Sequence, residues 1–148
     1  MTQKILIIGY GNNLRSDDSA GQKLAEIINQ WNLENVSSLA VHQLTPELSE
    51  AISQVDQVIF ADALLTPSEQ PATLQIIKLK AVSNTTNLGH YSDPSQLLSL
   101  TQAIYGRIPL AYWILIPAIN FEFGEQLSPV TGKAIQLAIT KIREMTLL

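Results

Sequence analysis

The chain has 148 residues, of which 46% are hydrophobic and 15% charged, and its net charge at pH 7 is -4. This composition is typical of a folded globular protein, and the acidic balance without any basic run argues against nucleic acid as a partner. Because the chain has no cysteine, disulfides, thiolate nucleophiles and thiolate-held metal clusters are excluded, so any metal must use oxygen or imidazole ligands. We expect residues 1–148 to form a single domain.

No export signal or membrane span is expected. The apolar run "ILII" before Gly9 is too short for the hydrophobic region of a signal peptide. The longest apolar stretch, residues 108–119, is about half the length that a membrane-spanning helix needs, and prolines interrupt it. We therefore expect a cytoplasmic protein, acting as a monomer.

The first part of the chain alternates strand and helix patterns. Residues 4–9 form an apolar run typical of a strand buried on both faces of a parallel sheet. The β-α-β-α-β order predicts a doubly wound sheet in which the first three strands lie in the order 2-1-3. The expected elements are a strand at 4–9, a helix from 19 to about 31, a strand at 36–44, a helix opening at Thr45 and Pro46 and running to about 55, and a strand at 57–62.

The pattern then changes. A strand signal at residues 72–80 follows Asp62 too closely for a parallel crossover, so we predict an antiparallel edge strand, which Lys78 and Lys80 also suit. A polar loop at 81–93 contains His90, and it is followed by a helix at 94–105, a strand at 110–117 and a helix from Ser128 and Pro129 to about 143. The whole predicts an α/β three-layer sandwich with a mostly parallel, twisted five-stranded sheet and one antiparallel edge strand.

Acidic residues follow two neighbouring strands of this sheet. Asp17 and Asp18 follow the first strand through "GYGNNLRSDD", and Asp62 ends the third. Doubly wound sheets bind ligands at such strand ends, and carboxylates that meet there repel one another unless they are protonated or bridged by a cation. With His90 as a third ligand, the set would suit zinc, nickel or a similar divalent ion.

Simpler roles stay open for the same residues. One acid of the pair Asp17 and Asp18 would bond the first-turn amides of the following helix, Asp62 would be a helix cap or a solvated loop acid, and His90 would be exposed and idle. His42, on the second strand, is expected to be packed or hydrogen-bonded.

Two other site types fit poorly. The third glycine of a dinucleotide-binding fingerprint is replaced by Leu14, and no acid ends the second strand. The G-x-S-x-G turn of serine hydrolases does not occur.

The motifs resemble those of the maturation endopeptidases of nickel–iron hydrogenases, which trim the C-terminal tail of the hydrogenase large subunit. The family opening G-x-G-N-x-L-x-x-D-[DE] matches "GYGNNLRSDD", its strand-three "AD" matches Ala61 and Asp62, and its histidine matches that of "LGHYSD". The late segment "ILIPAINFEFGEQLSPVTGKAI" looks like the family's strand and G-x-x-L-[ST]-P turn. The likeness covers nearly the whole chain.

The resemblance implies an aspartyl-type endopeptidase in which Asp18, Asp62 and His90 are the catalytic and metal-contacting residues, while Asp17 shapes the turn. It also implies that the recognised ion is nickel, presented by the hydrogenase large-subunit precursor, with a water activated by the metal or by a carboxylate making the cut. The chain departs from the family at Ser19, where many members have glycine, and at "HQLTPEL", where many have Gly-Gly-Thr; Asp18 is also shorter than the glutamate of several members. The alternative is a non-enzymatic nickel-precursor chaperone or a nucleotide-binding module on the same scaffold.

Overall fold

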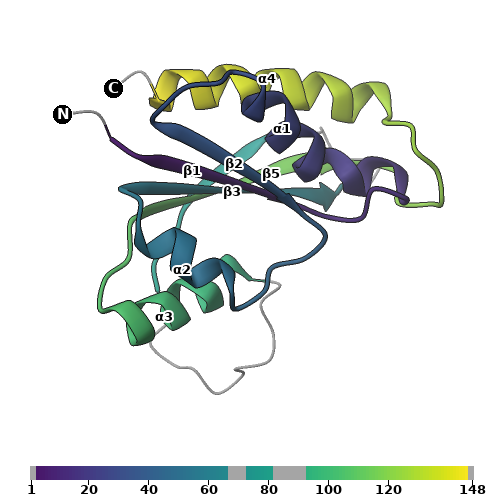
Figure 1. The fold of residues 1–148 in the computed structure, drawn as a ribbon. Coiled ribbons are helices and arrows are strands. Elements are labelled where there is room, and N and C mark those ends of the chain that lie inside the picture. Colours follow the sequence, from purple (N-terminus) through teal and green to yellow (C-terminus); the bar gives the residue numbers. More distant parts are fainter. Residues whose placement is uncertain (1–2, 67–72, 82–92, 147–148) are drawn as a thin grey trace.

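A computed structural model describes residues 3–66, 73–81 and 93–146. Its strands form one five-stranded sheet in the order β2-β1-β3-β5-β4 (Figure 1). Four are parallel: β1 (Ile5–Tyr10), β2 (Val36–Val41), β3 (Gln57–Leu65) and β5 (Leu110–Ala118). At one edge β4 (Gln75–Lys78) pairs antiparallel with β5. The predicted order of the first three strands and the antiparallel edge strand are confirmed.

Helices cover both faces of the sheet, which makes the predicted three-layer arrangement (Figure 1). One face carries α1 (Ala20–Asn29), which follows the short 3-10 helix η1 (Ser16–Ser19), and α4 (Pro129–Thr146). The other carries α2 (Leu48–Ser53) and α3 (Pro94–Tyr105). Within the described ranges, none of the helices combines the length and apolar character needed to cross a membrane.

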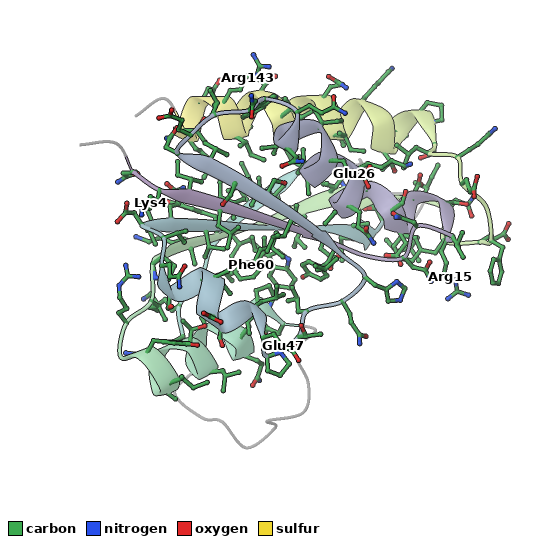
Figure 2. All side chains as sticks on the ribbon, in the orientation of Figure 1. Lys4, Arg15, Glu26, Glu47, Phe60 and Arg143 are labelled. Carbon is green, nitrogen blue, oxygen red and sulfur yellow. The ribbon has the colours of Figure 1, made fainter. Side chains whose placement is uncertain are left out.

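The sheet separates two apolar cores because alternate residues of each strand face opposite sides. Ile5 and Ile7 of β1 pack toward α1 and α4, whereas Leu6 and Ile8 pack toward α2 and α3. Phe60 of β3 is fully buried in the second core, between the sheet and α2 (Figure 2). Burying one such side chain stabilises the folded state by about 1.5–3 kcal/mol. Because both faces of β1 are buried, every position along it favours an apolar residue, which explains its unbroken apolar sequence.

Several element ends differ from those expected. β2 ends at Val41, so His42 lies beyond the strand and is exposed, contrary to the packed or hydrogen-bonded role expected for it. The helix expected from Thr45 begins only at Leu48, because the Leu48 and Ser49 amides close tight turns onto the carbonyls of Thr45 and Pro46 (3.1 Å each). The edge strand is shorter than predicted and α4 continues beyond residue 143.

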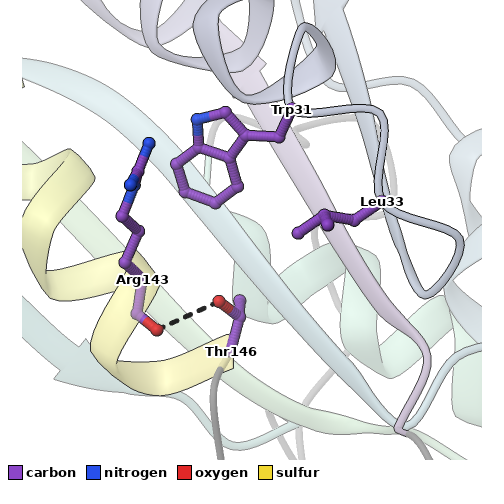
Figure 3. Close-up of a pocket in the computed structure, with 4 residues that line it drawn as sticks. All are labelled: Trp31, Leu33, Arg143 and Thr146. Atoms are coloured by element: carbon purple, nitrogen blue, oxygen red, sulfur yellow. Dashed lines mark hydrogen bonds between the residues drawn. The ribbon is translucent and has the colours of Figure 1, made fainter.

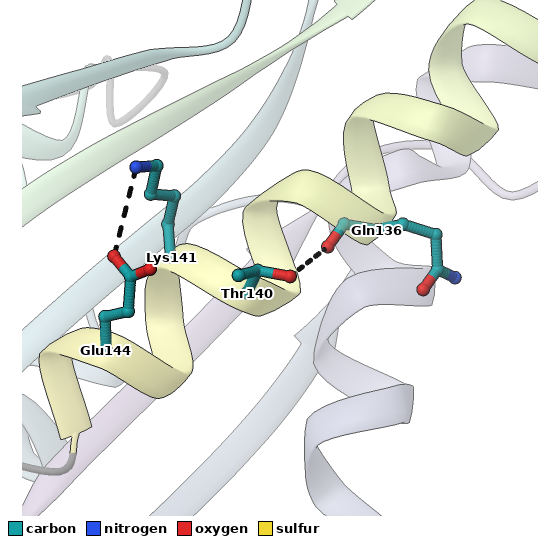
Figure 4. Close-up of polar contacts among 4 residues, drawn as sticks. All are labelled: Gln136, Thr140, Lys141 and Glu144. Atoms are coloured by element: carbon teal, nitrogen blue, oxygen red, sulfur yellow. Dashed lines mark hydrogen bonds and ion pairs between the residues drawn. The ribbon is translucent and has the colours of Figure 1, made fainter.

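The outer face of α4 is polar. Lys141 and Glu144 lie 3.9 Å apart as an exposed ion pair, and the Thr140 hydroxyl donates to the Gln136 carbonyl at 3.2 Å (Figure 4). Exposed pairs of this kind contribute about 0–1 kcal/mol. The docking of α4 therefore depends on its opposite, buried face, made by Ala134, Ile135, Ala138, Ile139 and Ile142.

Candidate functional site

Two glycines bring the acidic segment onto the carboxyl ends of the strands. A Cβ on Gly21, in the first turn of α1, would lie 2.4 Å from the Ala61 carbonyl oxygen and 2.6 Å from that of Tyr10. Gly11 has φ +142°, and a Cβ there would lie 2.0 Å from the Asp18 carbonyl oxygen. Only glycine allows these approaches, so the chain leaving β1 turns back over the ends of β1 and β3.

Asp17 is a structural residue at the centre of this turn. Its side chain is fully buried and accepts hydrogen bonds from the amides of Ile119 (3.0 Å), Asn120 (3.1 Å) and Ser128 (2.7 Å) and from the Ser128 hydroxyl (2.8 Å). The expectation that one acid of the pair bonds the first-turn amides of the next helix is therefore wrong for Asp17, because its partners lie between β5 and α4. Burial alone would raise the pKa of Asp17, but the donors of Ile119 and Ser128 outweigh it and lower that pKa below its ordinary value.

Further contacts join the acidic turn to the segment between β5 and α4. The Ser16 amide donates to the Gly124 carbonyl at 2.8 Å, and the Gly124 amide donates to that of Leu14 at 2.9 Å. The guanidinium of Arg15 lies 5.6 Å from the centre of the exposed Phe123 ring. The segment after β5 thus supports the acidic turn.

Asp18, next along the chain, is half-buried at the same sheet end. Its Oδ2 accepts a hydrogen bond from the Asn12 amide at 3.0 Å, which fixes the side chain across the turn. Within the described residues Oδ1 has no hydrogen-bond partner, so this oxygen is available to a ligand.

Asp62 lies on β3, opposite Leu115 of β5, and is half-buried. Its Oδ1 accepts from the Ala63 amide at 2.8 Å. Burial raises the pKa of Asp62 to about 7, with the negative charge of Asp18 adding to the rise, while the Ala63 amide and the Tyr10 hydroxyl oppose it. The structure thus brings Asp18 and Asp62 together, and one of them can take up or release a proton near neutral pH.

The sequence reasoning missed Tyr10, which is a neighbour of Asp62, and Trp113, which is a neighbour of Tyr10. Gly9 of β1 pairs with Ala61, so Tyr10 comes next to Asp62 across the two parallel strands. The Tyr10 hydroxyl is buried, and among the described residues neither it nor the Trp113 indole N–H has a well-formed hydrogen-bond partner. Tyr10 still interacts electrostatically with Trp113 and with Asp62: burial, followed by the Asp62 charge, raises the pKa of Tyr10. The sequence did carry a signal for this role, because Tyr10 follows Gly9 at the carboxyl end of a buried strand, where the site was expected.

The third predicted ligand, His90, lies outside the described residues. Across residues 3–66, 73–81 and 93–146, no group of three or more His, Asp and Glu side chains could hold a metal ion. The described residues thus offer two carboxylates, which suit a divalent cation by charge and by donor type but leave its ligand set incomplete.

Comparison with known proteins addresses the fold. Neither a family model nor a curated protein sequence matches the chain. Among solved structures, the hydrogenase maturating endopeptidase HybD from E. coli is similar at a TM-score of 0.75 and 22% identity, covering 94% of this chain and 89% of that one. The [NiFe] hydrogenase maturation protease HycI from Thermococcus kodakarensis KOD1 is similar at a TM-score of 0.76 and 20% identity, covering 99% and 94%. This chain has the maturation-endopeptidase fold.

A third similar structure extends the comparison. The [NiFe] hydrogenase maturation protease HybD from Thermococcus kodakarensis has a TM-score of 0.72 and 19% identity, covering 97% of this chain and 99% of that one. The likeness in fold expected from the motifs is confirmed. In this chain's version of the maturation-endopeptidase fold, the paired acids lie where an open α/β sheet offers its ligand site, at the carboxyl ends of the strands.

Proposed function

We propose that the chain is an endopeptidase that removes the C-terminal extension from the large-subunit precursor of a nickel–iron hydrogenase. The likeness in fold to proteases of this kind, over 94% or more of the chain, supports the proposal. The observation that carries it is the meeting of Asp18 and Asp62, from two separate segments, at the carboxyl ends of β1 and β3. The proposed setting is the cytoplasm, with the protein acting as a monomer.

The proposed site residues are Asp18, Asp62 and His90, and the ion they recognise is the nickel of the precursor. Two carboxylates and one imidazole leave open positions around a divalent ion. An ion already held in the precursor by thiolates would complete its ligand set only when precursor and protease meet, so a loaded precursor would bind better than an empty one. This would make cleavage depend on nickel insertion.

The proposed reaction is hydrolysis of a peptide bond. The oxygen of a water molecule bonds to the carbonyl carbon, the C–N bond breaks, and the leaving amine receives a proton. A carboxyl group whose pKa is about 7, as at Asp62, can take the proton from water and give it to the amine at neutral pH. When present, the nickel ion supplies a Lewis acid that polarises an oxygen bound to it.

A processing assay tests the proposal. Purified protein is incubated with nickel-loaded or nickel-free precursor, and mass spectrometry follows the loss of the tail. We expect loss from the loaded precursor only. Asp18→Asn, Asp62→Asn and His90→Ala should each lower kcat/KM by about 100-fold or more, the usual scale for an acid–base group.

The matched control is Glu26→Gln, which neutralises an exposed acid of α1 and should process at the parent rate. Equal processing by Asp62→Asn and the parent would contradict the site assignment. A stable complex with loaded precursor that never loses its tail would indicate the chaperone instead.

A further inference from the structure

β3 is longer than its neighbour β1, and this leaves a length of strand edge without a partner. The β1–β3 ladder ends at the pair Gly9 and Ala61, whereas β3 continues against β5 as far as the pair Leu65 and Ala118. On the β1 side, residues 62–65 have no strand partner in the part of the chain that the structure describes.

The hydrogen bonds at the two ends of β3 show which backbone groups point to that side. The Gln57 amide donates to Lys4, just before β1, at 3.2 Å, and the Thr66 amide donates to Ala118 of β5 at 2.7 Å. Because successive residues of a strand point their N–H and C=O groups to opposite neighbours, those of Ala63 and Leu65 face the β1 side.

One of these backbone groups already has a hydrogen-bond partner, and the others have none among the described residues. The Ala63 amide donates to Oδ1 of Asp62, so the carboxylate itself lies at the open edge. Within the described residues, the Ala63 carbonyl and the N–H and C=O groups of Leu65 have no hydrogen-bond partner. One donor and two acceptors are therefore presented in a line that begins at Asp62.

The side chains here do not protect the edge. Leu64 and Leu65 are 41% and 53% exposed, although they belong to a strand. One outer edge of the sheet, at β4, instead carries exposed Lys78, a charge that discourages the addition of another strand. An apolar, unpaired edge beside a paired-acid site is a place where an extended chain can bind.

We propose that residues 62–65 of β3 receive an extended segment of a polypeptide substrate as an added strand, in line with β1, and so lay a peptide bond beside Asp62. The identification of that segment as the C-terminal region of the hydrogenase precursor rests on the proposed function. Four residues of edge span about 13 Å, and a polypeptide backbone supplies donors and acceptors at the alternating spacing that this edge requires.

Amide exchange tests the added strand without requiring cleavage. The probe is a synthetic peptide carrying the C-terminal extension of a large-subunit precursor and the residues before it, added to ¹⁵N-labelled full-length protein. We expect exchange of the Leu65 amide to slow about threefold to tenfold at saturating peptide, which is the effect of forming one backbone hydrogen bond. The Leu64 amide, which faces β5, should not change. Unchanged exchange at Leu65 under saturation overturns the proposal.

Backbone-modified peptides give a second test that leaves the protein intact. A methyl group on one peptide nitrogen at a time should weaken binding at every second residue only, because an added strand turns alternate amides toward β3. Equal effects at all positions would contradict strand addition.

Two variants then connect the edge with processing. Leu65→Pro removes the free amide and should raise KM for loaded precursor about threefold to tenfold, whereas Leu65→Ala keeps the amide and should show the smaller change. If the peptide protects Leu65 but the parent removes no tail from nickel-loaded precursor, the peptidase is refuted and the strand edge is kept. If the parent removes the tail from loaded precursor but the peptide does not protect Leu65, the strand edge is refuted and the peptidase is kept.

Discussion

Asp17 and Asp18 carry the same charge one residue apart, but they have opposite surroundings. Asp17 is closed in by donors from the segment after β5, whereas Asp18 keeps one oxygen without a partner among the described residues. The first therefore holds the turn together and the second is left for a ligand. Variants of the two should separate stability from activity.

Asp17→Asn should destabilise the protein by about 1–3 kcal/mol, because an amide group would face donors that need an acceptor. The lowered folded-state pKa means that Asp17 stabilises the protein above its ordinary pKa, and that this contribution is lost as the pH falls through the folded value. Thermal unfolding from pH 7 to pH 3 should thus show a flatter acid dependence for the variant. Glu26→Gln is the exposed control, and a parent-like profile for Asp17→Asn would contradict the prediction.

Asp62→Asn should have the opposite effect on stability. The pKa of Asp62 is raised to about 7, so the protonated carboxyl group favours the folded state and ionisation lowers the stability. The stabilisation from the protonated form is complete below the ordinary pKa of an aspartate and is lost as the pH rises through about 7. In buffer with a chelator, the variant should exceed the parent by about 1–3 kcal/mol at pH 8 and lose most of this advantage at pH 4. If Asp62→Asn were only as stable as the parent at pH 8, or less stable, other groups must stabilise the charged Asp62 carboxylate.

At the scale of the element, the local pattern was informative where a residue's role depends on its own segment. The β-α-β-α-β order and the short link before β4 were enough to predict the order of the first three strands and the antiparallel edge strand. The partners of Asp17 were not predictable in this way, because they lie 102 to 111 positions further along the chain. The extension of β3 past Asp62 was missed for a related reason, since it depends on pairing with β5 rather than on residues 62–65 themselves.

The close approach of α1 to the strand ends gives an element-scale prediction. Gly21→Ala would put a Cβ 2.4 Å from the Ala61 carbonyl oxygen, a rigid backbone atom, so α1 must shift and take Asp17 and Asp18 with it. We expect a loss of about 1–3 kcal/mol in denaturant unfolding, accompanied by reduced processing. The control is Gly132→Ala in α4, where nothing lies within 4 Å and about 0.5–1 kcal/mol of stabilisation is expected. Similar effects of the two changes would contradict the close-approach argument.

At the scale of the whole molecule, the two ends of the sheet differ in chemistry. The carboxyl ends carry Asp18 and Asp62, whereas the hollow at the amino ends, of about 340 Å³, is lined by Trp31, Leu33, Arg143 and Thr146 (Figure 3). There the Arg143 guanidinium lies 4.8 Å from the centre of the Trp31 ring. These described lining residues include no acid, so the chemistry proposed for the other end has no counterpart here.

Arg143→Ala should therefore affect stability and leave processing unchanged. Removing an exposed cation from the face of an indole ring costs about 0.5–1 kcal/mol, which thermal unfolding would resolve. Lys141→Ala, on the same helix, removes only one half of an exposed ion pair and should cost less. If Arg143→Ala instead lowered kcat/KM for loaded precursor at unchanged fold, the precursor must reach across the molecule to the amino ends of the strands. The strand edge beside Asp62 would then be only one part of a larger contact surface.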